Sequence, residues 1–141
     1  MTSPHPIEDL KTLIASAAPR HEPGEYVFVT LSDATAIERL QPIGTFREAE
    51  GWSVLCARAH AEASGLPFSG CFGWIVLEVH SSLHAVGFLA AITSRLALEK
   101  IPCNAVSAYH HDHLFVPIER VEEAMETLRA WIREESPAPR L

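Results

Sequence analysis

The sequence has no run of basic residues and no long apolar stretch. Its 11 Lys and Arg are outnumbered by 18 Asp and Glu, which gives a formal net charge of −7. Because nucleic-acid binding needs a basic patch that neutralises phosphates, we expect no nucleic-acid partner. No apolar stretch reaches the roughly 18–20 residues that cross a bilayer, and residues 1–6 lack a charged segment followed by an apolar core. We therefore expect a cytoplasmic protein without a membrane partner.

Cysteine is scarce, and no two of Cys56, Cys71 and Cys103 form a C-x-x-C pair. Each lies in or beside an apolar segment, where a free cysteine behaves as a small hydrophobic residue, and this pattern favours a reducing compartment. The glycine-rich signatures of P-loop, dinucleotide and kinase sites are missing, as is the G-x-S-x-G elbow of serine hydrolases. The motifs thus assign no catalytic residue, metal ligand or cofactor, and we expect a protein that is not an enzyme.

The first half of the chain alternates helical and extended patterns. In order, the predicted elements are a helix over 7–17, a strand over 26–31, a short helix over 34–40, a hairpin of 43–48 and 52–57, and a helix over 58–64. Ser32 or Asp33 is expected to cap the short helix, because their side-chain oxygens accept backbone N–H groups. Gly51 is expected in the hairpin turn, since glycine adopts positive φ at low cost.

The second half repeats this order with longer helices. Its predicted elements are a strand over 72–80, a helix over 83–100, a hairpin of 103–109 and 113–116, and a helix over 118–134. Ser81 and Ser82 are expected to cap the first of these helices, with Gly87 inside it. Its core stripe is predicted to be Val86, Leu89, Ala90, Thr93, Leu96 and Ala97. Phe88 and Ile92 then lie on another face, which predicts a contact with another element or subunit.

These patterns predict an α+β fold of two ferredoxin-like repeats, with antiparallel sheets and helices packed on one face of each. Residues 1–71 form the first repeat with its leading helix, and residues 72–141 form the second. The second repeat lacks an obvious closing strand, so the N-terminal helix and the strand over 26–31 are candidates to complete a shared sheet. The tail from Glu135 onward contains two prolines and is expected to fray.

Histidines concentrate in the second half of the chain, around one aspartate. The group comprises His80, His84, His110, His111 and His113, with Asp112 among them. In a ferredoxin-like sheet we expect the loop after the first strand and the second hairpin at opposite ends, which separates His80 from His113. We therefore favour turn histidines held by backbone groups and Asp112. A metal site or small enzyme using the His110–His113 turn is the alternative.

The start of the helix predicted over 83–100 offers a second kind of site. Free backbone N–H groups and the positive end of the helix dipole, flanked by the Ser81 and Ser82 hydroxyls, can hold a carboxylate. The α-carboxylate of an amino acid fits such a place. The other interpretation is that both serines only cap the helix.

Two segments resemble a known family. Residues 79–117, VHSSLHAVGFLAAITSRLALEKIPCNAVSAYHHDHLFVP, and residues 42–55, PIGTFREAEGWSVL, are similar to small bacterial proteins with tandem ACT-like repeats and no assigned function. The resemblance implies a non-enzymatic regulatory protein that binds a small molecule, an amino acid first of all. A protein-interaction module without a ligand is a further alternative. We also expect a homodimer, formed through sheet edges or through the face of Phe88 and Ile92.

The resemblance also implies where a ligand binds. In ACT domains the loop between the first strand and the first helix forms the amino-acid site together with the second strand of a neighbouring domain. The residues that correspond are His80, Ser81, Ser82 and Leu83 in the loop, Asn104 and Ala105 in the strand, and Ser32 and Asp33 in the first repeat. Many ACT loops carry an Asp-x-x-Gly turn, and residues 81–84 of this sequence stand in its place.

Overall fold

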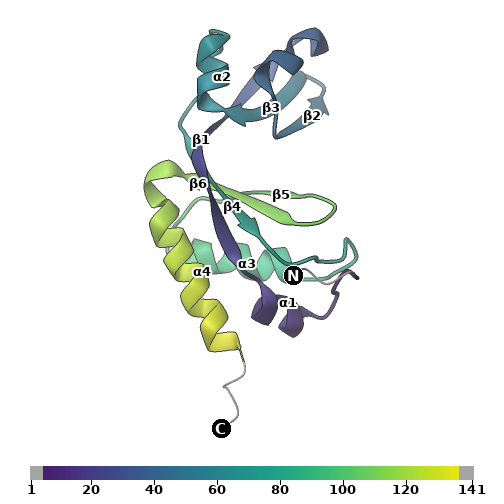
Figure 1. Cartoon of the computed structure of the whole chain (residues 1–141), viewed down its shortest axis with the longest axis vertical. Coiled ribbons are helices and arrows are strands. Elements are labelled where there is room, and N and C mark those ends of the chain that lie inside the picture. Colours follow the sequence, from purple (N-terminus) through teal and green to yellow (C-terminus); the bar gives the residue numbers. More distant parts are fainter. Residues whose placement is uncertain (1–4, 137–141) are drawn as a thin grey trace. The chain divides into compact units, whose positions relative to one another are not determined.

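The computed structural model describes residues 5–136, which form two compact units (Figure 1). Unit 1 joins the chain up to Glu22 with the chain from Trp74 onward, and unit 2 comprises Pro23–Gly73. The leading helix therefore packs with the second half of the sequence. The predicted boundary between residues 71 and 72 divides the chain into two consecutive repeats rather than into compact units, and it stays a prediction. The end of the tail predicted to fray, from residue 137, lies outside the described residues.

Unit 2 is built around a hairpin paired with the longest strand of the chain. Strand β1 (Pro19–Leu31) pairs antiparallel with β3 (Gly51–Ala57), which pairs antiparallel with β2 (Gly44–Glu48). Helix α2 (Arg58–Ala63) follows directly. The core of unit 2 consists of the buried residues Val27, Val29, Leu31, Leu40, Val54, Cys56 and Ala61. The predicted hairpin and the helix after it are confirmed.

The helix predicted over 34–40 is wrong in type. The segment forms two short 3-10 turns, η1 (Ala34–Ala36) and η2 (Glu38–Leu40). Asp33 caps the first by accepting the Thr35 N–H at 3.0 Å, as predicted. Gln41 then adopts a left-handed conformation and Pro42 follows, so the segment cannot extend into a regular helix.

Unit 1 carries three helices against a sheet in the order β1-β4-β6-β5 (Figure 1). The strands after β1 are β4 (Phe72–Leu77), β5 (Asn104–Ser107) and β6 (Asp112–Pro117). The helices are α1 (Leu10–Ser16), α3 (Phe88–Leu98) and α4 (Val121–Glu135), the last preceded by the 3-10 turn η3 (Ile118–Arg120). The first residues of β1 supply the closing strand, and the Glu78 N–H donates to the Ala18 carbonyl at 3.0 Å just before them.

The core of unit 1 lies between its helices and the sheet. Alternate residues of the central strands, such as Ile75 and Leu77 on β4 and Leu114 and Val116 on β6, are fully buried in one cluster. This alternation is the period of a strand with one face turned to the core. Helix α4 adds the buried residues Val121, Met125, Leu128 and Ile132 to this core, and the predicted helix over 118–134 is confirmed.

Helix α3 begins later than predicted. Gly87 occupies its N-cap position with a φ of 90°, a left-handed conformation that glycine adopts easily, and residues 82–87 form a loop. The predicted start at Leu83, capped by Ser81 and Ser82, is therefore wrong, and Gly87 belongs to the loop. The predicted core stripe is correct at Leu96, which is fully buried, but wrong at Val86, which is 84% exposed, whereas Phe88 and Ile92 are only 3% and 0% exposed. The last two lie in the core, so a dimer cannot form through them.

Candidate functional site

The loop after β4 is held by hydrogen bonds to the segment before α1. The Ile7 N–H donates to the His80 carbonyl at 2.8 Å, and the Ser82 N–H donates to the Ile7 carbonyl at 2.9 Å. The Ser82 hydroxyl donates to the Glu8 carboxylate at 3.1 Å and accepts the His84 N–H at 3.0 Å. Ser82 is buried, and these bonds use its hydroxyl proton.

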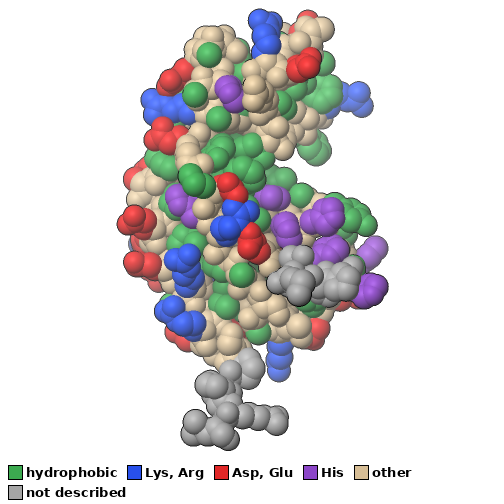
Figure 2. Space-filling model, viewed as in Figure 1, with side chains coloured by type: hydrophobic (Ala, Val, Ile, Leu, Met, Phe, Trp, Pro, Cys, Tyr) green, Lys and Arg blue, Asp and Glu red, His purple; other side chains and the backbone are tan. Residues whose placement is uncertain are grey.

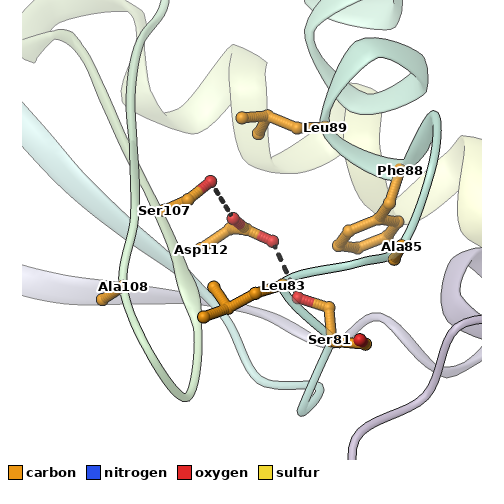
Figure 3. A pocket seen from close by; sticks show the side chains of 9 residues that line it. Ser81, Leu83, Ala85, Phe88, Leu89, Ser107, Ala108 and Asp112 are labelled. Atoms are coloured by element: carbon orange, nitrogen blue, oxygen red, sulfur yellow. Dashed lines mark hydrogen bonds between the residues drawn. The ribbon is translucent and has the colours of Figure 1, made fainter.

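A pocket of about 100 Å³ opens between this loop, the start of α3 and the end of β5 (Figure 3). Its walls are formed by Ser81, Ser82, Leu83, Ala85, Phe88, Leu89, Ser107, Ala108 and Asp112. The pocket is thus large enough for the head group of a small molecule.

Asp112 is the charged residue among those that line the pocket, and it is 6% exposed. Figure 3 shows its carboxylate between two serines from different elements. The Ser107 hydroxyl, on β5, donates to Oδ1 at 2.7 Å, and the Ser81 hydroxyl, in the loop, donates to Oδ2 at 3.1 Å. Among residues 5–136, no Lys, Arg or His forms an ion pair with this carboxylate. We call this site the Asp112 pocket.

The structure brings some of the predicted ligand residues together and separates others. Ser81, Ser82 and Leu83 line the Asp112 pocket, whereas His80 does not. Asn104 and Ala105 are exposed at the start of β5, away from the end of that strand where Ser107 lines the pocket. Ser32 and Asp33 lie exposed in unit 2. A ligand role for each of these residues stays a prediction.

The histidines divide into two groups. His80, from the loop after β4, lies beside His110 and Tyr109 of the β5–β6 turn, with ring centroids 5.4 and 6.3 Å apart. The expectation that this loop and turn lie at opposite ends is therefore wrong, and Figure 2 shows histidine side chains gathered on one face. His113 lies elsewhere, where its Nδ1 accepts the Trp74 indole N–H at 3.0 Å. No three His, Cys, Asp or Glu side chains of the described residues are placed to hold a metal ion.

Sequence reasoning missed Asp112, Ser107 and Phe88 as parts of a pocket. A signal for Asp112 was present, since Asp112, Leu114 and Val116 alternate on one face of β6, and the latter two are core residues. The same alternation turns Asp112 toward the interior. Ser107 carried no comparable signal, because the pairing of Ser107 with Asp112 depends on the exact turn of the hairpin.

Burial shifts several ionisable groups. Desolvation lowers the pKa of His113, helped by the charges of His111 and Arg20, while Asp112 acts in the opposite direction. Burial raises the pKa of the Cys103 thiol to about 11 and that of the Cys56 thiol in the same direction. Both thiols are thus protonated near neutral pH, and neither is an activated nucleophile.

Comparisons with known proteins give a consistent picture. Residues 5–73 and 72–130 match two family models, each described as an ACT domain. A Vibrio cholerae protein of unknown function, described as a possible transport protein, is 38% identical with a TM-score of 0.80, and the match covers 87% of this chain and 95% of that one. No curated protein sequence matches significantly. No helix within residues 5–136 has the length and apolarity to cross a bilayer.

More distant solved structures share the fold. A protein from Agobacterium tumefaciens is 19% identical with a TM-score of 0.68, covering 82% of this chain and 88% of its own. The ligand-free regulatory subunit of aspartate kinase from Thermus thermophilus is 8% identical with a TM-score of 0.60, covering 79% and 94%. At these identities the likeness concerns the arrangement of strands and helices, and it confirms the predicted α+β fold of tandem repeats.

Proposed function

Since the chain belongs to the ACT family and carries two ACT domains in tandem, we propose that it is a regulatory protein that binds an amino acid in the Asp112 pocket. The observation that carries the proposal is the pocket itself, which opens at the loop between the first strand and the first helix of the second domain. A regulatory subunit of aspartate kinase shares the fold, which supports a role in sensing rather than catalysis. We accordingly propose that the protein is not an enzyme.

The size of the pocket favours a small ligand or the head group of a larger one. At about 100 Å³ it holds few heavy atoms, and the exposed side chain of Leu83 lies at its wall. A longer ligand side chain would extend past Leu83 toward solvent. Phe88 and Leu89 from the first turn of α3 add apolar wall to the polar surface of Ser81 and Asp112.

Thermal-shift and calorimetric titration of the full chain against the twenty amino acids tests this function. At least one is expected to raise the melting temperature, because a ligand that binds only the folded state stabilises it by mass action. Ala108→Leu, which fills the pocket from an exposed position, is expected to abolish the shift. Ala97→Leu, an equal change at an exposed position of α3, is expected to keep it. No shift and no heat with any amino acid would refute the function.

We also propose that the protein acts as a cytoplasmic homodimer that pairs through β5. All four residues of this strand are exposed, and it is the last strand of its sheet. Such an edge presents backbone donors and acceptors that a second copy can pair with. The pairing is tested by measuring the molar masses of the unchanged protein and of Val106→Lys by sedimentation equilibrium. If both proteins have the molar mass of a single chain, pairing through β5 is ruled out.

A further inference from the structure

The Asp112 pocket presents oxygen atoms whose protons are already committed. A hydroxyl has one proton to donate and two lone pairs to accept with. The Ser81 and Ser107 protons both go to Asp112, so each hydroxyl can offer a ligand only its lone pairs. The Ser82 proton goes to Glu8 in the same way. These side-chain oxygens therefore form a wall of acceptors.

The carboxylate has capacity left over. An ionised carboxylate accepts at about four lone-pair positions, and two hydroxyl bonds leave about half of them open. Two neutral hydroxyls supply hydrogen bonds but no positive charge, and a buried charge without a counter-charge is costly. The imidazoles beside it in sequence have other contacts: His113 Nδ1 accepts from Trp74, and His111 Nδ1 lies 3.4 Å from the Val79 carbonyl oxygen.

We propose that the Asp112 pocket recognises the protonated amine of its ligand, with Asp112 as counter-ion and the Ser81 and Ser107 hydroxyls as acceptors. An alkylammonium group carries three N–H donors and one positive charge, which matches three acceptor groups, two hydroxyls and one carboxylate, and one negative charge. The same wall repels a carboxylate, so the acid group of an amino acid lies away from Ser81 and Asp112. The assignment rests on the proposed function for the choice of ligand and names the ligand group that this site selects.

The test compares probes that differ only in the amine. ¹⁵N-labelled full-length protein is titrated at neutral pH with L-alanine and L-lactate, and with ethanolamine and ethylene glycol. L-Alanine and ethanolamine are expected to shift the amide resonances of Ser81, Ser107 and Asp112. Their partners without the amine are expected to bind at least about tenfold more weakly, because hydrogen bonds to charged groups are the stronger ones.

A pair of variants gives a second readout. Asp112→Asn keeps the shape of the side chain and removes its charge, and it is expected to weaken ethanolamine and L-alanine about 10- to 100-fold. Glu38→Gln removes an exposed carboxylate from unit 2 and is expected to change neither affinity. Should Asp112→Asn fail to fold, the probe pairs on the unchanged protein decide the question.

Each result separates this inference from the proposed function. If L-lactate binds at the pocket as tightly as L-alanine, amine recognition is overturned while amino-acid binding in the pocket stands. If amino acids shift resonances elsewhere only, both amine recognition and the assignment of the ligand to the Asp112 pocket are overturned. If ethanolamine binds at the pocket and no amino acid does, amine recognition stands and the proposed function fails. If no probe and no amino acid binds, both are wrong.

Discussion

The loops that follow β1 and β4 hold corresponding places in the two repeats, and they differ at the strand start beside them. In unit 1 that strand is β6, which begins with Asp112 opposite Ser107. In unit 2 it is β3, which begins with Gly51 opposite Glu48. A Cβ atom on Gly51 would lie 2.6 Å from the Leu31 carbonyl oxygen, so backbone approaches backbone there. The first residue of the strand thus differs in its role: Gly51 in β3 allows close backbone contact, whereas Asp112 in β6 places a side chain in a pocket.

The carboxylates near the two loops, Asp33 and Asp112, also differ in burial and in hydrogen bonding. Asp33, after β1, is exposed and accepts the Thr35 N–H, and this bond lowers the pKa of the Asp33 carboxyl. Asp112, beside the loop after β4, is buried and accepts two hydroxyls. An exposed carboxylate that caps a turn is a local structural device, whereas a buried one without a cation costs stability. Residues that lower stability are characteristic of binding sites, and this contrast supports the proposed ligand site in unit 1.

The largest expected effect on stability comes from adding a side chain at Gly51, the first residue of β3. Gly51→Ala is expected to lower the free energy of unfolding by about 2–4 kcal/mol, because the new Cβ meets the Leu31 carbonyl and φ is +141°. Gly44→Ala in the same hairpin is the control, since nothing lies within 4 Å of its Cβ and the change is expected to be near neutral. Urea denaturation measures both. Equal losses would show that unit 2 has room at this strand start.

A smaller effect is expected from the serine that holds Asp112. Ser107→Ala removes one of the two hydrogen bonds to a buried carboxylate and is expected to cost about 1–2 kcal/mol. Asp33→Ala removes the exposed cap of η1 and is expected to cost less than Ser107→Ala. Urea denaturation of both variants compares the two loops directly. A larger loss of stability for Asp33→Ala than for Ser107→Ala would mean that the hydroxyl bonds do not stabilise the buried Asp112 carboxylate.

Much of the fold followed from residue patterns, and the pocket did not. Residue patterns and turn residues located the hairpin around Gly51 and the helix α4, because local periodicity reports burial. The start of α3 was missed because residues 83–86 fit a helical pattern, while the bonds from Ile7 to His80 and Ser82 that hold a loop there join segments far apart in sequence. Ser81 was identified from its place before the predicted helix and by resemblance, but its bond to Asp112 could come only from the tertiary structure.

The smallest expected effect concerns the other face of β6, where Trp74 donates its indole N–H to His113. The pKa of His113 is lowered from an ordinary value of 6.5, chiefly by desolvation, so the unfolded chain takes up a proton before the folded one does. Stability is thus fully present above about 6.5 and declines as the pH falls from there toward the folded-state pKa. Protonation at Nδ1 would also remove the acceptor that the Trp74 indole uses.

His113→Asn isolates this contribution, because the asparagine oxygen can replace Nδ1 as the acceptor for Trp74 while carrying no titratable group. The variant is expected to lose less melting temperature than the unchanged protein between pH 7 and pH 5. His21→Asn, at an exposed position of β1, controls for the exchange of residue type and is expected to follow the unchanged protein. If His113→Asn and the unchanged protein show parallel melting curves over this range, protonation of His113 does not contribute to acid sensitivity, and the sheet face behind Asp112 tolerates the charge.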